Sequence, residues 1–145
     1  IFYLLKRTDA ADEAKAEAFT RQWAAAFPSD PVLLFNQAVI AQSKNDTAAA
    51  KELYEKLLKV APTHVSALNN LAWLHYTDKR YDKALPLAQR ASELAPENAP
   101  VLDTYGMILL ASGKASDGIK TLERAHELAP DSDEIRRHLE EARKR

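Results

Sequence analysis

Several features that would point to particular chemistry are missing from this sequence. It has no cysteine, which excludes disulfides and thiolate metal sites and is compatible with cytoplasm or periplasm alike. No apolar run approaches the about 18 residues that a membrane-spanning helix needs. The 20 basic and 21 acidic residues are mixed along the chain and leave a net charge of −1, which argues against a nucleic-acid partner.

Residues for catalysis are equally scarce. The three glycines form no loop that would cradle a phosphate. No two histidines are spaced i, i+4, and there is no His-Glu-x-x-His motif, so the sequence predicts no metal site. We therefore predict no catalytic residue, no metal and no cofactor, and a protein that is not an enzyme unless a site comes from sequence outside this segment. The four histidines are His64, His75, His126 and His138.

What is present is a repeat. Pro28, Pro62, Pro96 and Pro130 follow one another at a constant interval of 34 residues. A period of this length is typical of a solenoid built from helix-turn-helix units. Each unit cannot bury its apolar face alone, so stability comes from packing on its neighbours.

Other positions keep the same phase when each unit is counted from the third residue after its proline. Position 8 and position 20 are always small, which lets two antiparallel helices approach closely. Positions 4, 10 and 30 are always aliphatic and are predicted to fill the space between helices and between units. The small residues are Ala38, Ala72, Gly106, Ala50, Ala84 and Gly118; the aliphatic ones are Leu34, Leu68, Leu102, Ile40, Leu74, Ile108, Val60, Leu94 and Leu128.

This pattern resembles the tetratricopeptide repeat family, in which small residues at positions 8 and 20 and proline at position 32 are diagnostic. The resemblance implies an all-α fold, a right-handed superhelix of antiparallel helix pairs. It divides the chain into a partial repeat (1–30), three full repeats (31–64, 65–98 and 99–132) and a capping helix (133–145). Position 7 departs from the usual leucine with Gln37 and Tyr105, which affects local packing only.

Helix boundaries follow from capping residues. Asp30 and Asn98 each stand just before a helix start that contains a proline in its first turn. Asp131, with Glu134 three residues later, predicts a capping box at the last helix. Asn45 and Gly113 tolerate the left-handed conformation that ends a helix.

The N-terminal residues are expected to be part of an incomplete unit. Residues 10–28 continue the phase as a second helix, and residues 1–7 fall at positions 5 to 11 of a first helix. The chain is therefore predicted to be a piece of a longer protein. The apolar stretch Ile1–Leu5 would then lack its natural neighbour, which predicts weak self-association through this end.

The resemblance also implies a concave groove lined by the first helices of successive units. Position 6 of each unit forms a polar row, Asn36, Asn70, Thr104 and His138. These side chains either pair with the backbone of an extended peptide or bond neighbouring helices, and the sequence favours neither. The predicted partner-binding residues are Phe35, Asn36, Val39, Asn69, Asn70, Trp73, Tyr76, Asp103, Thr104 and Met107.

Trp73 is the residue in this groove with the clearest signal. Tyr76 lies three residues on, so the two rings share one helix face, and Asn69 and Asn70 place amides beside the indole. Aromatic anchors beside orienting amides are typical of a peptide-binding hot spot. The alternative is that Trp73 packs against the next unit and only stabilises the solenoid.

Family members that bind chaperone tails hold a terminal carboxylate with Lys, Asn and Arg at set groove positions. Here Phe35 and Val39 stand at two of those positions, and Pro100 and Thr104 replace the basic pair. The resemblance therefore disfavours a chaperone tail ending in EEVD as the partner.

A second resemblance concerns the C-terminal half. The runs at 67–74, 101–106 and 134–139 are similar to repeats of bacterial proteins associated with PEP-CTERM sorting and exopolysaccharide export. It implies an assembly scaffold in the periplasm or cell envelope. Two functions thus remain open: a protein–protein interaction scaffold that binds a peptide or partner helix in its groove, or a structural spacer without a ligand of its own.

Overall fold

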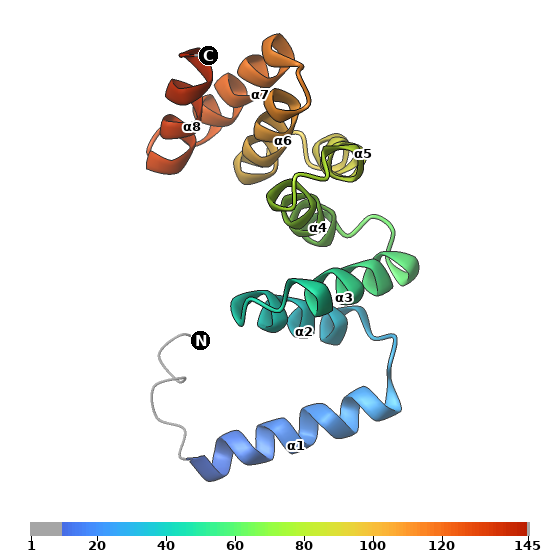
Figure 1. Ribbon diagram of the computed structural model, residues 1–145. Coiled ribbons are helices and arrows are strands. Elements are labelled where there is room, and N and C mark those ends of the chain that lie inside the picture. The colour runs from blue at the N-terminus through green and yellow to red at the C-terminus, as the bar shows by residue number, and fades with distance from the viewer. Residues whose placement is uncertain (1–9, 145) are drawn as a thin grey trace.

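A computed structural model describes residues 10–144, and these residues form eight α-helices with no strand among them. The helices stack as antiparallel pairs into the predicted right-handed superhelix, with α1 at one end and α8 at the other (Figure 1). Residues 1–7, with the half-helix expected there, lie outside the described part. The helices are α1 Ala10–Ala26, α2 Pro31–Ser43, α3 Thr47–Val60, α4 Val65–Thr77, α5 Tyr81–Leu94, α6 Ala99–Ala111, α7 Ala115–Leu128 and α8 Asp133–Arg143.

The predicted helix starts are confirmed at two places and wrong at a third. The Leu33 amide donates to Asp30 Oδ1 at 2.9 Å, and the Val101 amide donates to Asn98 Oδ1 at 3.2 Å. At α8, however, the cap is Ser132, whose hydroxyl accepts from the Ile135 amide, and not Asp131. The predicted capping box does not form, because Ser132 takes the extended backbone that an N-cap needs and the residue three positions later is Ile135, not a glutamate.

The turns inside the three helix pairs are equivalent. Asn45, Lys79 and Gly113, each 34 residues apart, have φ values of 59°, 59° and 80°. The left-handed conformation is confirmed at Asn45 and Gly113, and it also occurs at Lys79, where a long side chain gives no sequence signal for it.

Close helix crossings form the core of each pair. The six small residues at positions 8 and 20 are all buried, as predicted. Where α6 crosses α7, a Cβ added to Gly106 would lie 2.7 Å from Leu122 Cγ and 3.1 Å from the Gly118 carbonyl oxygen. Glycine at this crossing is therefore a packing requirement.

Two of the predicted aliphatic packing residues are exposed. Ile40 is 52% exposed, whereas Leu74 and Ile108 at the same repeat position are buried. Those two pack against the second helix of the preceding unit, in clusters with Leu57 and with Ala84 respectively. The preceding second helix for Ile40 is α1, which does not cover it. Val60, a smaller side chain than its counterparts, is also 47% exposed.

Burial rises from α2 through α4 to α6, the first helices of the three pairs. In α2 three of the 13 residues are buried, and in α6 nine of the 13 are buried. On α1, the side chains of residues 14–26 are exposed except for Ala24, which is half-buried. The described part of the solenoid is therefore best packed at α6 and least packed at α1.

Candidate functional site

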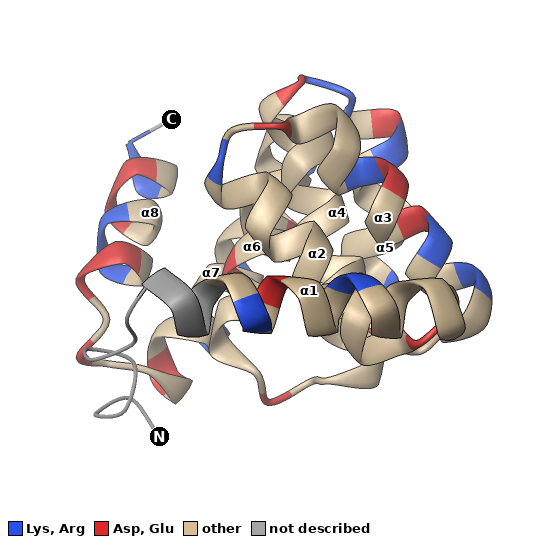
Figure 2. Ribbon diagram, turned by 90° about the horizontal axis from the view of Figure 1, so that it is seen from below, with Lys and Arg blue, Asp and Glu red and all other residues tan. Residues whose placement is uncertain are grey.

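The first helices of the three complete pairs differ from the rest of the surface in charge. Together α2, α4 and α6 contain a single Asp, Glu, Lys or Arg, which is Asp103. In Figure 2 these helices are almost entirely tan, whereas charged residues recur along α3, α5 and α8. We call the surface formed by α2, α4 and α6 the inner wall. It presents amides, hydroxyls and aromatic rings in place of ion pairs.

At the α2–α4 end of the inner wall, polar side chains bond one helix to another. The Asn70 amide donates to the Tyr54 hydroxyl at 2.9 Å, and that hydroxyl donates to Gln42 Oε1 at 3.0 Å. Tyr54 is fully buried, and burial raises the pKa of its hydroxyl while the hydrogen bond with Asn70 lowers it. Phe35 packs beside this chain, with its ring 4.9 Å from the His64 ring. In this structure Asn70 therefore joins neighbouring helices.

In the middle of the inner wall, the Trp73 and Tyr76 rings stack with centroids 5.0 Å apart and planes 30° from parallel. Both side chains are half-buried. Tyr76 also contacts the Tyr81 ring at 5.9 Å, which links α4 to α5. The two aromatic residues thus share one face and keep part of their surface accessible.

Beside Trp73 lies a pocket of about 170 Å³ between α4, α6 and the start of α8. We call it the Trp73 pocket. Its wall combines one aromatic ring, one amide and two carboxylates, and contains no lysine or arginine. The lining residues are Asn69, Trp73, Pro100, Asp103, Thr104, Ser132, Glu134 and Ile135.

Asp103 lines this pocket and connects α6 to α8 through His138. It is 8% exposed, and both of its carboxylate oxygens lie 2.9 Å from His138 Nδ1. Burial raises the pKa of the Asp103 carboxyl and the nearby charge of Glu134 raises it further, while the hydrogen bond and the charge of His138 lower it. Within the described residues, ligand atoms of Asp103, Glu134 and His138 lie within 4.8 Å of one another, a donor set that a cation would accept.

The other predicted groove residues of α6 are less accessible. Thr104 is 7% exposed and Met107 is 8% exposed. Met107 packs in a cluster with Leu122, Leu139 and Ala142. Only a small part of either side chain is available to a partner.

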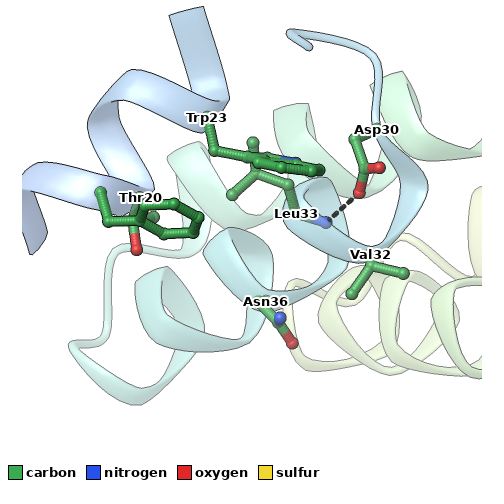
Figure 3. A pocket seen from close by; sticks show the side chains of 7 residues that line it. Thr20, Trp23, Asp30, Val32, Leu33 and Asn36 are labelled. Atoms are coloured by element: carbon green, nitrogen blue, oxygen red, sulfur yellow. Dashed lines mark hydrogen bonds between the residues drawn. The ribbon is translucent and has the colours of Figure 1, made fainter. Parts of the chain in front are cut away.

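A second pocket, of about 530 Å³, lies between α1 and α2. Trp23 extends from α1 toward Leu33 of α2, and Asn36 lies at the edge of this space (Figure 3). Asn36 is exposed and Val39, three residues on, is 40% exposed. Asn36 and Val39 are therefore at the surface, whereas Phe35 is half-buried, and Asn36 borders an apolar hollow that the sequence analysis does not predict.

The Asp103–His138 pair is also not predicted from the sequence. The two residues are 35 positions apart, one repeat plus one residue. Position 5 of one unit therefore meets position 6 of the next, and that offset is the signal from which the contact could be found.

Among the helices of residues 10–144, none combines the length and the apolar character that a membrane span requires.

Comparisons with known proteins agree with this architecture. Two tetratricopeptide repeat family models match residues 35–99 and 75–142. The chain is 30% identical over 92 residues to the TPR repeat-containing protein PA4667 of Pseudomonas aeruginosa, of which it covers 16%. It is 29% identical over 100 residues to human tetratricopeptide repeat protein 7B, of which it covers 12%. The chain thus spans a small part of the curated relatives that it matches.

Solved structures show the same fold. An O-GlcNAc transferase mutant of Thermobaculum terrenum superposes with a TM-score of 0.74 at 33% identity, over 77% of this chain and 22% of that one. MamA of Desulfovibrio magneticus gives 0.79 at 22% identity, over 92% and 75% of the two chains. A TPR domain of Spaghetti (RPAP3), solved with the HSP90 peptide SRMEEVD, gives 0.73 at 19% identity, over 79% and 90%. The chain belongs to the tetratricopeptide repeat family, whose fold is that of a protein–protein interaction scaffold.

Proposed function

We propose that this segment binds an extended peptide or a partner helix along its inner wall, with Trp73 as the principal anchor. The observation that carries the proposal is the half-buried Trp73–Tyr76 stack beside a pocket, on a wall that has one charged residue. Partly exposed aromatic rings supply a large contact area at a small cost in side-chain entropy. A solenoid that served only as a spacer would have no need of this surface.

The polar residues on the wall suit backbone recognition. Asn36 is exposed at the α2 end, and the Asn69 amide oxygen has no hydrogen-bond partner among the described residues. An amide carries both a donor and an acceptor, so it can pair with the peptide groups of an extended chain whatever its sequence. Asn70 is already bonded to Tyr54 and would contribute through the rigidity of the wall.

The proposal concerns binding and not catalysis. The transferase among the structural relatives is four to five times longer than the matched region, which covers 22% of it, and so its activity is not carried over to this chain.

A random peptide display tests the proposal directly. Peptides selected on the wild-type protein should bind Trp73→Ala at least about 30-fold more weakly, which corresponds to roughly 2 kcal/mol. The melting temperature should change little, because Trp73 is half-buried. Val60→Ala, an exposed position on α3, is the control and should keep full affinity.

Two results would contradict it. If Trp73→Ala instead destabilises the fold by about 3–5 kcal/mol, the indole is a core residue. If no peptide is enriched above background on the wild type, the spacer hypothesis is favoured. Acrylamide quenching of Trp73 fluorescence, measured with Trp23 replaced by Phe, gives an independent readout, since an accessible indole is quenched.

A further inference from the structure

The Trp73 pocket has a chemistry that goes beyond general peptide binding. Asp103 is the single charged residue of the inner wall, and it lies inside this pocket. Glu134, from the first turn of α8, is the second charged residue of the lining. Burying a carboxylate is costly unless a donor or a cation faces it. Asp103 is buried and Glu134 is exposed, and the two carboxylates lie on one pocket wall with no lysine or arginine beside them, an arrangement that favours a positively charged ligand.

The carboxylates are only partly satisfied within the described structure. Asp103 accepts from His138 Nδ1, and a single ring N–H cannot satisfy both oxygens. Glu134 forms no ion pair with any described lysine, arginine or histidine, and its charge acts against that of Asp103. A cation between the two carboxylates would replace a repulsion by two attractions.

The uncharged part of the pocket has matching features. The Asn69 amide oxygen is buried without a hydrogen-bond partner among the described residues. An unpaired buried acceptor carries a free-energy cost that an added donor would remove. The Trp73 ring forms another wall, and an aromatic face attracts cations, a planar guanidinium in particular.

The size of the pocket limits the ligand to one head group. The pocket volume of about 170 Å³ is several times the ~30 Å³ that one water molecule occupies in the liquid. A pocket of this size is too small for a helix or a folded partner. A guanidinium with its adjoining methylene fits such a space and carries five N–H donors.

We propose that the Trp73 pocket is a subsite for an arginine side chain of a peptide bound to the inner wall. Asp103 and Glu134 pair with the guanidinium, and Trp73 stacks on it. This inference rests on the proposed function and adds a partner class, an extended peptide with a basic residue. A basic residue in the bound peptide is the opposite charge preference to that of a domain solved with an acidic peptide such as SRMEEVD.

The test separates the subsite from the groove by using a minimal probe. Nα-acetyl-arginine N-methylamide is titrated into the protein and followed by the indole N–H resonance of Trp73, and the citrulline analogue serves as its neutral isostere. We expect a saturable shift with arginine and at least tenfold weaker binding of citrulline. Because the contact is electrostatic, raising the salt concentration should weaken the arginine response.

Glu134→Gln is the informative variant, since Glu134 is exposed and its loss leaves the fold intact. It should reduce arginine affinity at least threefold, while Glu140→Gln, an exposed change further along α8, should not. Asp103→Asn should abolish the response, and its helicity by circular dichroism is checked because it also alters the contact with His138.

Three outcomes would overturn the proposal. Equal affinity for the arginine and citrulline probes would show that the positive charge of the ligand does not contribute to binding. Loss of the response on adding EDTA would show a metal-bridged site on Asp103, Glu134 and His138. No shift at Trp73 at any concentration would remove the subsite, and the proposed function would still stand if displayed peptides bind in a Trp73-dependent way.

Discussion

At the scale of single residues, positions that are equivalent in the repeat do not carry equal strain. Asn45, Lys79 and Gly113 end equivalent helices with a positive φ, and only glycine does so without a steric cost at Cβ. All three are exposed, so their environments differ little. The repeat therefore offers a set of matched sites at which backbone strain can be measured.

Exchanging these residues gives the first prediction. Lys79→Gly should stabilise the protein by about 0.5–1 kcal/mol, because relief of left-handed strain outweighs the added chain entropy of the unfolded state. Gly113→Lys should destabilise it by a similar amount. Urea denaturation measures both, and a Lys79→Gly variant less stable than the wild type would contradict the argument.

Gly106 gives a second prediction at this scale. An alanine there gains up to about 1 kcal/mol of helix propensity, but its Cβ would lie 2.7 Å from Leu122 Cγ and close to a backbone oxygen that cannot move aside. We expect Gly106→Ala to destabilise the protein by about 1–3 kcal/mol. Ser116→Ala, an exposed change in α7, is the control and should have little effect in the same denaturation experiment.

His75 supplies a prediction about pH. Its side chain is 8% exposed, and burial, followed by the positive charges of Lys51 and Lys83, lowers its pKa. The unfolded chain therefore takes up a proton at a higher pH than the folded one. Stability is complete above the unfolded value of about 6.5 and is lost as the pH falls toward the lower folded pKa.

The measurement is the free energy of unfolding between about pH 7 and pH 5. His75→Tyr removes the titrating group while keeping a large ring, and its stability should fall less steeply with acid than that of the wild type. The nearby Glu55 and Asp78 carboxylates raise the pKa of His75 and so oppose the effect of the lysines. Both carboxylates are present in the wild type and in the variant, so the difference between the two pH profiles comes from His75. Parallel pH profiles would show that His75 is not the group responsible.

At the scale of elements, α1 carries an exposed apolar stripe that continues one residue past its end, to Phe27. Phe19, Trp23 and Phe27 lie four residues apart and are 63%, 42% and 52% exposed. Their rings contact one another along the helix, with centroids 5.9 and 4.8 Å apart. Such a stripe favours association with an apolar partner.

We therefore predict that this segment self-associates weakly through α1. The sedimentation coefficient should rise with protein concentration, and Phe19→Ser combined with Trp23→Ser should remove that dependence. Gln22→Ser, an exposed polar change on the same helix, is the control. Concentration dependence that persists in the double variant would place the contact elsewhere, such as at residues 1–9.

At the scale of the whole molecule, the 34-residue period was sufficient to predict the helices, their pairing and the small residues at the crossings. The residue type gave no signal for the positive φ at Lys79, because a lysine does not favour that conformation; only its 34-residue spacing from Asn45 and Gly113 indicates it. The period could not predict that Ile40 would be exposed, since that depends on how α1 packs. At the candidate site, the period places Trp73 and Tyr76 together, but the Asp103–His138 contact arises from the offset between neighbouring units.

Hydrogen exchange should show the unequal packing of the array directly. A solenoid is stabilised by contacts between neighbouring units, so local opening follows local burial. We expect amides of α6 to exchange slowest and those of α1 fastest, with α2 between them. Uniform protection from α2 to α7 would mean that the array opens as one cooperative unit.

The rise in burial from α1 to α6 also bears on how the chain folds while it is being made. The ribosome releases the N-terminal units first, and domains generally begin to fold in that order. Within this segment, α1 and α2 bury fewer residues than α4 and α6, which emerge later. The exposed apolar stripe of α1 would thus be accessible to other proteins before the later helices of the segment have been synthesised. This is the stage at which chaperones would bind it.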